Sequence, residues 1–257
     1  PSAIMSLLKV PLLMLGSIAV HTTMTSPNPA APTERQLKPS GLERIAPKWA
    51  PVLLKGVFWG LGIAECVTIL AQHFPHLETI SQALDPNNGA AHLTLTPTFL
   101  AGFISSIVGT SIRLHCYSRL QKHFTFELST RPDQQLVTDG AYGLVRHPSY
   151  LGALFSGIGA ALCVFVPGSW LVACSGLVRP GEAWEPKISA IWAVALTLAA
   201  VGLGSRIRKE DRMMKERFGK EWEDWVGRVP YRLVPFRALY TPRGRSSGHE
   251  DRSELHL

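Results

Sequence analysis

Hydrophobic and polar residues alternate along the chain in long blocks, and five of these blocks are apolar runs. A helix needs about 20 apolar residues to cross roughly 30 Å of hydrocarbon. The fourth run contains Pro167-Gly168 and is too long for one straight helix, so we expect it to bend there. The pattern predicts an all-α integral membrane protein of about five transmembrane helical units, at residues 4–20, 49–71, 98–114, 150–177 and 188–203.

The first run has a second interpretation, because a short apolar stretch near the start of a chain can be a signal peptide or an anchor. Lys9 and Pro11 interrupt this run, and no clearly basic segment precedes it. These features favour a membrane span. The signal peptide stays open as an alternative.

Basic residues are distributed unevenly between the polar segments. The formal net charge is +7, although only 18% of the residues are charged. Lys and Arg gather in 35–48, 119–146 and 206–252, whereas 72–96 contains neither. With five spans, the three basic segments fall on one side, and such segments usually face the cytosol. The distribution therefore predicts a cytosolic C-terminus, and membrane lipids rather than nucleic acid as the partner of the positive charge.

The polar segment after the third run ends in residues that suit a binding site. Asp139-Gly140 is a turn signal, and Pro148 fits the first turn of a helix, where its missing N–H is not needed. His147 and Tyr150 should therefore lie at the mouth of a membrane helix, where unpaired backbone N–H groups favour an anionic group. The alternative is an ordinary basic anchor, with Tyr150 in an interfacial aromatic belt.

A second informative segment follows the fifth run. Arg206 and Glu210 are four residues apart and share one helix face, so they could form a simple ion pair. Charged residues then alternate with Met214, Trp222 and Trp225, which is typical of an amphipathic helix on a membrane surface.

Taken together, the two segments resemble the isoprenylcysteine carboxyl methyltransferase family, and more loosely its phospholipid N-methyltransferase relatives. The similarity covers about residues 124–235 and consists of G-x-Y-x-x-x-R-H-P-x-Y-x-G, a membrane hairpin, R-x-x-x-E-[DE], F-G-x-E-W and V-P-Y-x-L-[IV]-P, in that order. Asp211 replaces the commoner second Glu, and residues 178–187 lengthen the hairpin. The resemblance implies a multi-pass enzyme of the endoplasmic reticulum membrane that uses S-adenosylmethionine.

The resemblance also implies roles for particular residues. Arg206 matches the residue that contacts the acceptor carboxylate, and is the candidate catalytic residue. Glu210 matches an acidic residue that holds the donor, while Glu127 lies where a polar donor contact can occur. We expect the other donor-binding residues to be Gln134, Gln135, Leu136, Val137, Tyr142, His147, Pro148, Ser149 and Tyr150. The His and Cys residues show no metal-binding pattern, so no metal is expected.

The runs and the resemblance divide the chain into four parts. Residues 1–48 form an N-terminal span and a Pro-rich cytosolic linker, and residues 49–118 form transmembrane helices. Residues 119–240 form a methyltransferase core with a donor-binding loop, a membrane hairpin and a cytosolic C-terminal amphipathic helix. Residues 241–257, rich in Gly, Ser and Arg, form a disordered tail.

The implied reaction moves a methyl group from a sulfonium to the C-terminal carboxylate of a prenylated cysteine. This carboxylate has a pKa of roughly 3.5 and is ionised at neutral pH, so no general base is required. Positioning would supply most of the acceleration. The expected partners are prenylated protein C-termini or a lipid substrate. The alternatives are a phospholipid N-methyltransferase, a membrane protein like the sterol reductases, and a catalytically silent paralogue.

Overall fold

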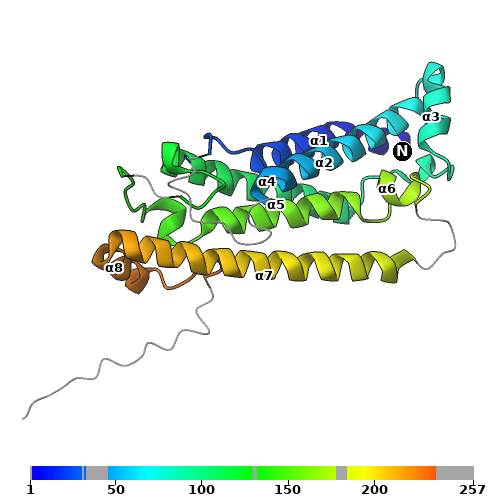
Figure 1. The fold of residues 1–257 in the computed structure, drawn as a ribbon. Coiled ribbons are helices and arrows are strands. Elements are labelled where there is room, and N and C mark those ends of the chain that lie inside the picture. Colours follow the sequence, from blue (N-terminus) through cyan, green and yellow to red (C-terminus); the bar gives the residue numbers. More distant parts are fainter. Residues whose placement is uncertain (1, 31, 33–45, 130–131, 178–183, 236–257) are drawn as a thin grey trace, which may run out of the picture.

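The computed structural model describes residues 2–30, 32, 46–129, 132–177 and 184–235, and within them the chain is helical, without β-strands (Figure 1). The α-helices are α1 Ser2–Thr23, α2 Ala46–Ala71, α3 Glu78–Leu84, α4 Pro97–Leu120, α5 Pro148–Val164, α6 Trp170–Ala173, α7 Trp184–Phe218 and α8 Lys220–Arg228. Short 3-10 helices are η3 Pro75–Leu77, η4 Ala90–His92, η5 Gln121–His123 and η6 Gly140–Gly143. The expected tail at 241–257 and most of the linker and hairpin insertion lie outside the described residues.

Three described helical segments are long and apolar enough to cross a membrane, at 6–23, 49–71 and 97–123. The fourth apolar run is divided, because α5 ends at Val164 and α6 begins at Trp170. Gly168 lies between them with φ +90°, a backbone conformation that glycine adopts without strain. The fifth run lies within α7, where most side chains are outside the description. Five spans therefore stay a prediction.

The backbones of α4 and α5 approach closely, because small residues line their contact. A Cβ atom on Gly109 would lie 2.3 Å from the backbone nitrogen of Ser156, so a larger residue would force the helices apart. Close approach through glycine and serine is usual where helices pack inside a membrane. This contact holds the start of α5 beside the end of α4.

A buried ion pair joins α1 and α2 within their apolar segments. Lys9 Nζ lies 2.5 Å from Glu65 Oε1 and also donates to the carbonyl of Gly168. The backbone N–H of Trp170 donates to Glu65 Oε2 at 3.0 Å. A charged side chain inside a membrane is costly unless it is paired, so these contacts explain how Lys9 can interrupt the first run. They also tie α1 and α2 to the turn before α6.

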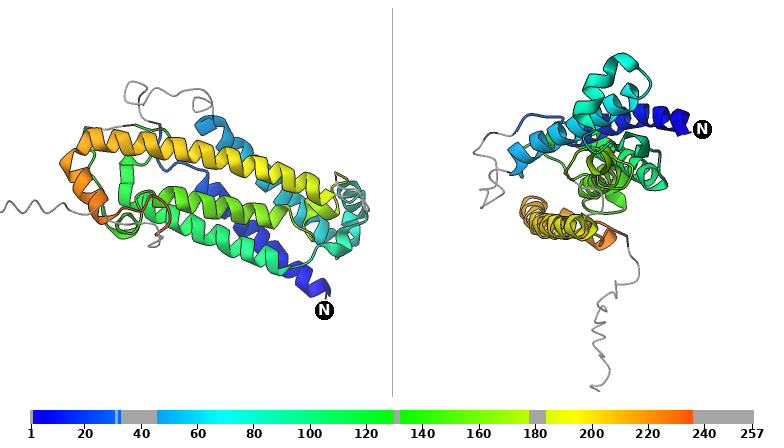
Figure 2. Two further views of the ribbon diagram at one scale, coloured as in Figure 1. Left: turned by 90° about the horizontal axis from the view of Figure 1, so that it is seen from below. Right: turned by 90° about the vertical axis from the view of Figure 1, so that its right-hand side faces the viewer.

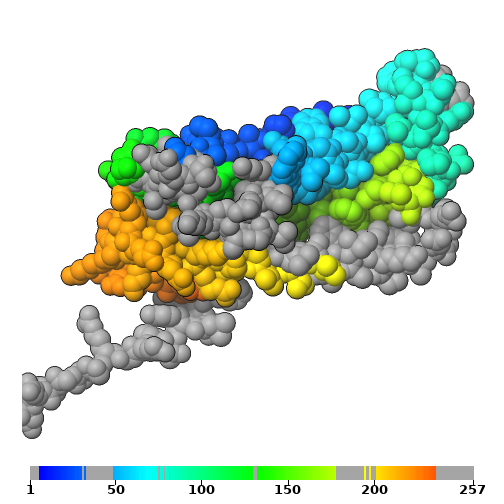
Figure 3. All heavy atoms as spheres, viewed as in Figure 1, coloured from blue at the N-terminus to red at the C-terminus, as the bar shows by residue number. Residues whose placement is uncertain are grey.

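The long helices run lengthwise, with α3 and α6 at one end and α8 at the other (Figures 1 and 2). At the end that contains α8, the described part of the segment between α4 and α5 lies near the C-terminal part of α7 and near α8 (Figure 3). Trp225 of α8 is buried against Cys116 and Tyr142. The sequence predicted that Trp225 belongs to an amphipathic helix lying on a membrane surface. For Trp225 this prediction is wrong, because its side chain packs against the protein interior instead.

Candidate functional site

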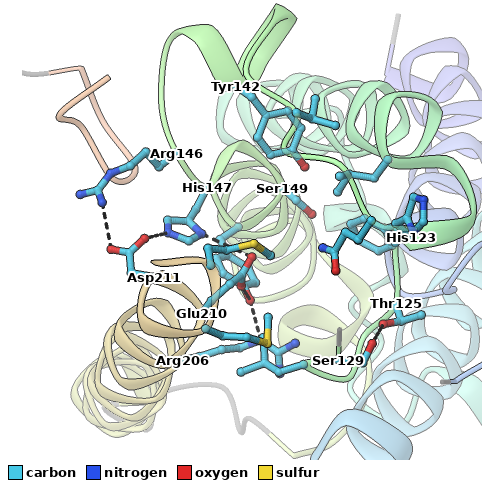
Figure 4. A pocket seen from close by; sticks show the side chains of 18 of the residues that line it. His123, Thr125, Ser129, Tyr142, Arg146, His147, Ser149, Arg206, Glu210 and Asp211 are labelled. Atoms are coloured by element: carbon cyan, nitrogen blue, oxygen red, sulfur yellow. Dashed lines mark hydrogen bonds and ion pairs between the residues drawn. The ribbon is translucent and has the colours of Figure 1, made fainter. Parts of the chain in front are cut away.

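A cavity of about 290 Å³ opens at this end of the bundle. Its wall combines the end of α4, residues 123–129 and 134–142, the start of α5, the C-terminal part of α7, and α8 (Figure 4). The volume lies near the lower limit of roughly 300 to 1,000 Å³ for small-molecule sites. Segments far apart in the sequence therefore build one binding site.

His147 lies at the centre of the polar wall, between two carboxylates of α7. Its Nε2 is 2.9 Å from Asp211 Oδ1, and its Nδ1 is 3.7 Å from Glu210 Oε1 (Figure 4). The imidazole also stacks on the ring of Tyr150, with 5.6 Å between centroids. The side chain is thus held from three directions.

The two carboxylates determine the protonation state of His147. Burial opposes the charged imidazolium, but the contacts with Asp211 and Glu210 outweigh burial and raise the pKa of His147 to about 9. Burial likewise opposes the ionised forms of Glu210 and Asp211, yet the contacts with His147 leave the pKa of both carboxyls lowered. At neutral pH the centre therefore holds one imidazolium and two carboxylates.

Asp211 also holds the C-terminal segment against the loop before α5. Its Oδ2 lies 3.1 Å from Arg146 Nη1 and 3.2 Å from Arg232 Nε. The backbone N–H groups of Arg146 and His147 donate to the carbonyls of Tyr231 and Arg232, at 2.8 and 2.9 Å. These contacts hold the V-P-Y-R segment, residues 229–232, beside the R-H-P motif, residues 146–148. Both motifs therefore contribute to one site.

Tyr150 connects the two residues that the sequence assigns to donor and acceptor. Its hydroxyl donates to Glu210 Oε2 at 2.5 Å and accepts from Arg206 Nε at 2.6 Å. Arg206 Nη2 donates to the carbonyl of Phe126. The guanidinium of Arg206 is therefore already oriented by the protein.

Arg113 is a cavity residue that the sequence analysis missed. It is buried at the end of α4, and its guanidinium lies 5.3 to 5.6 Å from the ring centroids of Tyr117, Phe124 and Phe126. Its Nη1 donates to the carbonyl of Ser149 at 3.3 Å. Within the described residues no carboxylate pairs with this cation, so it can receive an anion. A single Arg at the end of an apolar run gives no signal that distinguishes it from an interfacial anchor.

Unpaired polar atoms indicate what the cavity can bind. Four lining residues each carry a buried side-chain atom without a hydrogen-bond partner among the described residues: His123 Nδ1, Arg146 Nε, Ser149 Oγ and Trp222 Nε1. Buried polar atoms are normally paired, so a polar ligand is the simplest explanation. The methionyl group, ribose and adenine of S-adenosylmethionine carry donors and acceptors of this kind. The residues present fit that molecule.

Almost all of the sequence-predicted site residues lie together around the cavity. Pro148 is the exception, because it is fully buried as the first residue of α5 and lines no part of the wall. Glu127, a weak match in sequence, does line the cavity. The other predicted residues at the wall are Gln134, Gln135, Leu136, Val137, Tyr142, His147, Ser149, Tyr150, Arg206 and Glu210.

Two Delta(14)-sterol reductases are similar to parts of this chain. The protein from Mus musculus is 28% identical over 109 residues, which are 42% of this chain and 21% of the reductase. The protein from Gibberella zeae is 28% identical over 121 residues, which are 42% of this chain and 25% of the reductase. The similarity therefore spans only a quarter or less of these relatives.

A third relative is a methyltransferase. Protein-S-isoprenylcysteine O-methyltransferase B of Arabidopsis thaliana is 28% identical over 137 residues, which are 52% of this chain and 58% of that protein. No solved structure matches the chain. Residues 100–179, which include most of α4, all of α5 and part of the cavity wall, match the model of the isoprenylcysteine carboxyl methyltransferase (ICMT) family. Over this segment, the chain is similar to the isoprenylcysteine carboxyl methyltransferase family.

Proposed function

We propose that this membrane protein uses S-adenosylmethionine to methylate the C-terminal carboxylate of a prenylated cysteine, at the cytosolic face of the endoplasmic reticulum. The match of residues 100–179 to the family model and the similarity to the Arabidopsis relative support a methyltransferase. The choice of acceptor rests on one observation, the position of His147 between the carboxylates of Asp211 and Glu210.

An amine acceptor must lose a proton before methylation, so it needs a nearby base. His147, with its pKa raised to about 9, holds its own proton at neutral pH. Glu210 is a weak base because its pKa is lowered, and it is already bonded to Tyr150. A carboxylate with a pKa of roughly 3.5 is nucleophilic without any base. The centre therefore suits a carboxylate better than the amine of a phospholipid.

When bound, S-adenosylmethionine supplies a methyl group on an electrophilic sulfonium. Glu210 would place a carboxylate beside this positively charged donor, whereas Asp211 is already paired with His147, Arg146 and Arg232. Ser149 and the start of α5 suit its carboxylate, because a helix N-terminus favours anions. Trp222 offers a flat apolar surface for adenine.

Arg206 and Arg113 would orient the acceptor carboxylate. Arg206 is held by Tyr150 and the Phe126 carbonyl, so its guanidinium has a defined direction. Arg113 adds a second cation that has no carboxylate partner among the described residues. Two fixed guanidinium groups would hold the carboxylate in one orientation, and positioning of this kind supplies most of the acceleration in such a reaction.

A reductase that uses NADPH is the second candidate, because two of the similar proteins are sterol reductases. A nicotinamide dinucleotide is much larger than S-adenosylmethionine and carries several negative phosphate charges. Arg146 and His147 are already paired with Asp211, and the cavity volume is about 290 Å³. Both features favour the smaller, positively charged donor.

Ligand binding to the detergent-solubilised protein separates the two candidates. We expect saturable binding of S-adenosylhomocysteine, lost in Glu210→Gln and kept in Glu216→Gln, an exposed position on the same helix. We expect no saturable binding of NADPH. Binding of NADPH without binding of S-adenosylhomocysteine would reverse the assignment.

A further inference from the structure

The cation at the end of α4 is oriented by a tyrosine one helical turn further along. Arg113 Nε donates to the hydroxyl of Tyr117 at 3.0 Å, and this hydroxyl donates to the carbonyl of Thr23 at 3.1 Å. All three residues are buried. The hydroxyl therefore accepts one bond and donates another, which gives Arg113 a single preferred orientation.

Thr23 is itself fixed, because it ends α1 against α4. Its side chain is fully buried, and its Oγ1 lies 2.9 Å from Thr110 Oγ1. Thr110 also donates to the carbonyl of Ala19 at 3.2 Å. Met24, the next residue after α1, lines the cavity. The first helix, which lies outside the family match at residues 100–179, is thus part of the cavity's supporting structure.

We propose that Tyr117 is a positioning residue for the acceptor, which couples the end of α1 to the guanidinium of Arg113. This inference rests on the proposed carboxyl methyltransferase function. The side chain of Tyr117 touches neither the donor-binding motif nor the carboxylates of α7 in any described contact, and it does not line the cavity. The hydroxyl of Tyr117 therefore acts on the cavity through Arg113, while its ring packs against Phe124.

The substitution Tyr117→Phe tests the bond with little change in packing. The ring stacks against Phe124 with 4.4 Å between centroids, and phenylalanine keeps this contact. Loss of the hydroxyl leaves Arg113 Nε buried without its partner, and bonds to charged groups contribute more than neutral ones. We expect binding of the acceptor to weaken by about tenfold or more.

The measurement is calorimetric binding of an S-farnesylcysteine analogue with a free carboxylate, in detergent and with saturating S-adenosylhomocysteine. Tyr117→Phe should weaken binding of this analogue while leaving the affinity for S-adenosylhomocysteine unchanged. Ser118→Ala is the control, because it removes an exposed hydroxyl of α4 that bonds to the carbonyl of His115 and does not line the cavity, and it should bind both ligands normally. If Tyr117→Phe lost binding of both ligands, the hydroxyl would have only a structural role, and the proposal would be overturned.

Arg113→Lys supplies the second test. Lysine has no Nε–H at the position that Tyr117 contacts, so adding Tyr117→Phe to Arg113→Lys should cause no further loss of acceptor binding. Independent, additive losses would overturn the coupling. If the unmodified protein binds no acceptor analogue, the proposed function fails. If it binds the analogue and Tyr117→Phe binds it equally well, only the positioning role fails.

Discussion

The hydroxyl of Tyr150 and Oε2 of Glu210 lie 2.5 Å apart, and this bond joins the first turn of α5 to the C-terminal half of α7. The same hydroxyl accepts from Arg206. One side chain therefore connects the carboxylate proposed to hold the donor with the guanidinium proposed to hold the acceptor. The two halves of the site depend on each other through this contact.

The first prediction concerns Tyr150→Phe, which keeps the ring but removes its hydroxyl. We expect the affinity for S-adenosylhomocysteine to fall by about 10-fold or more, because Glu210 loses a buried bond to a charged group. His147→Ala should also lower the affinity for S-adenosylhomocysteine, since it removes the imidazolium beside Glu210. Calorimetry measures both effects. Unchanged affinities would return both residues to the role of interfacial anchors.

The second prediction separates Arg206 from Glu210. Arg206→Lys should keep donor affinity but raise the acceptor KM or lower kcat, because lysine cannot make a planar two-point contact with a carboxylate. Glu210→Gln should mainly weaken the donor. Kinetics of both variants against both substrates provide the measurement, with Arg212→Lys as an exposed control on the same helix. Small, equal effects on all parameters would indicate a simple exposed pair worth about 0 to 1 kcal/mol.

The third prediction concerns stability at alkaline pH. The pKa of His147 in the folded protein, about 9, is raised above the value of roughly 6.5 for an unfolded chain. Its contribution to stability is therefore fully present below pH 6.5 or so and is lost as the pH rises through about 9. Thermal denaturation in detergent should show a larger loss of stability between pH 7 and pH 10 for the unmodified protein than for His147→Gln. Parallel curves would contradict the raised pKa.

The fourth prediction concerns the buried pair of α1 and α2. Lys9→Met leaves Glu65 without its cation in an apolar environment, with the N–H of Trp170 still bonded to it, which should destabilise the protein by roughly 3 to 5 kcal/mol. Lys9→Met combined with Glu65→Leu should recover most of this loss, because both charges are removed. Melting temperatures in one detergent test this. A single variant as stable as the unmodified protein would show that the pair is unimportant.

Much of the site could be predicted from sequence because its parts are short motifs with fixed spacing. The motifs R-H-P-x-Y and R-x-x-x-E-D, in that order, predicted that His147 and Glu210 belong to one site. Both residues line the cavity. The apolar runs likewise predicted the helices, including the break between α5 and α6 near Pro167.

Other features depend on contacts between distant segments, which periodicity does not encode. Arg113 has a cavity role only because α5 and residues 123–126 fold around it. Asp211 was read as a mild departure from the family, yet it contacts three basic groups, of which Arg232 comes from beyond α8. The sequence around Trp225 has the pattern of a surface helix, but the Trp225 side chain packs against Cys116 of α4.

The central claim is methylation of a carboxylate, and the most direct measurement is transfer of a labelled methyl group in membranes that contain the protein. S-Adenosylmethionine labelled in its methyl group is offered with an S-farnesylcysteine analogue, and in parallel with a phosphatidylethanolamine derivative. A methyl ester releases its label as volatile methanol in alkali, whereas an N-methyl amine does not. We predict alkali-labile label on the farnesylcysteine analogue, lost in Glu210→Gln and kept in Glu216→Gln. Alkali-stable label on the lipid, or no transfer to either acceptor, would contradict the account.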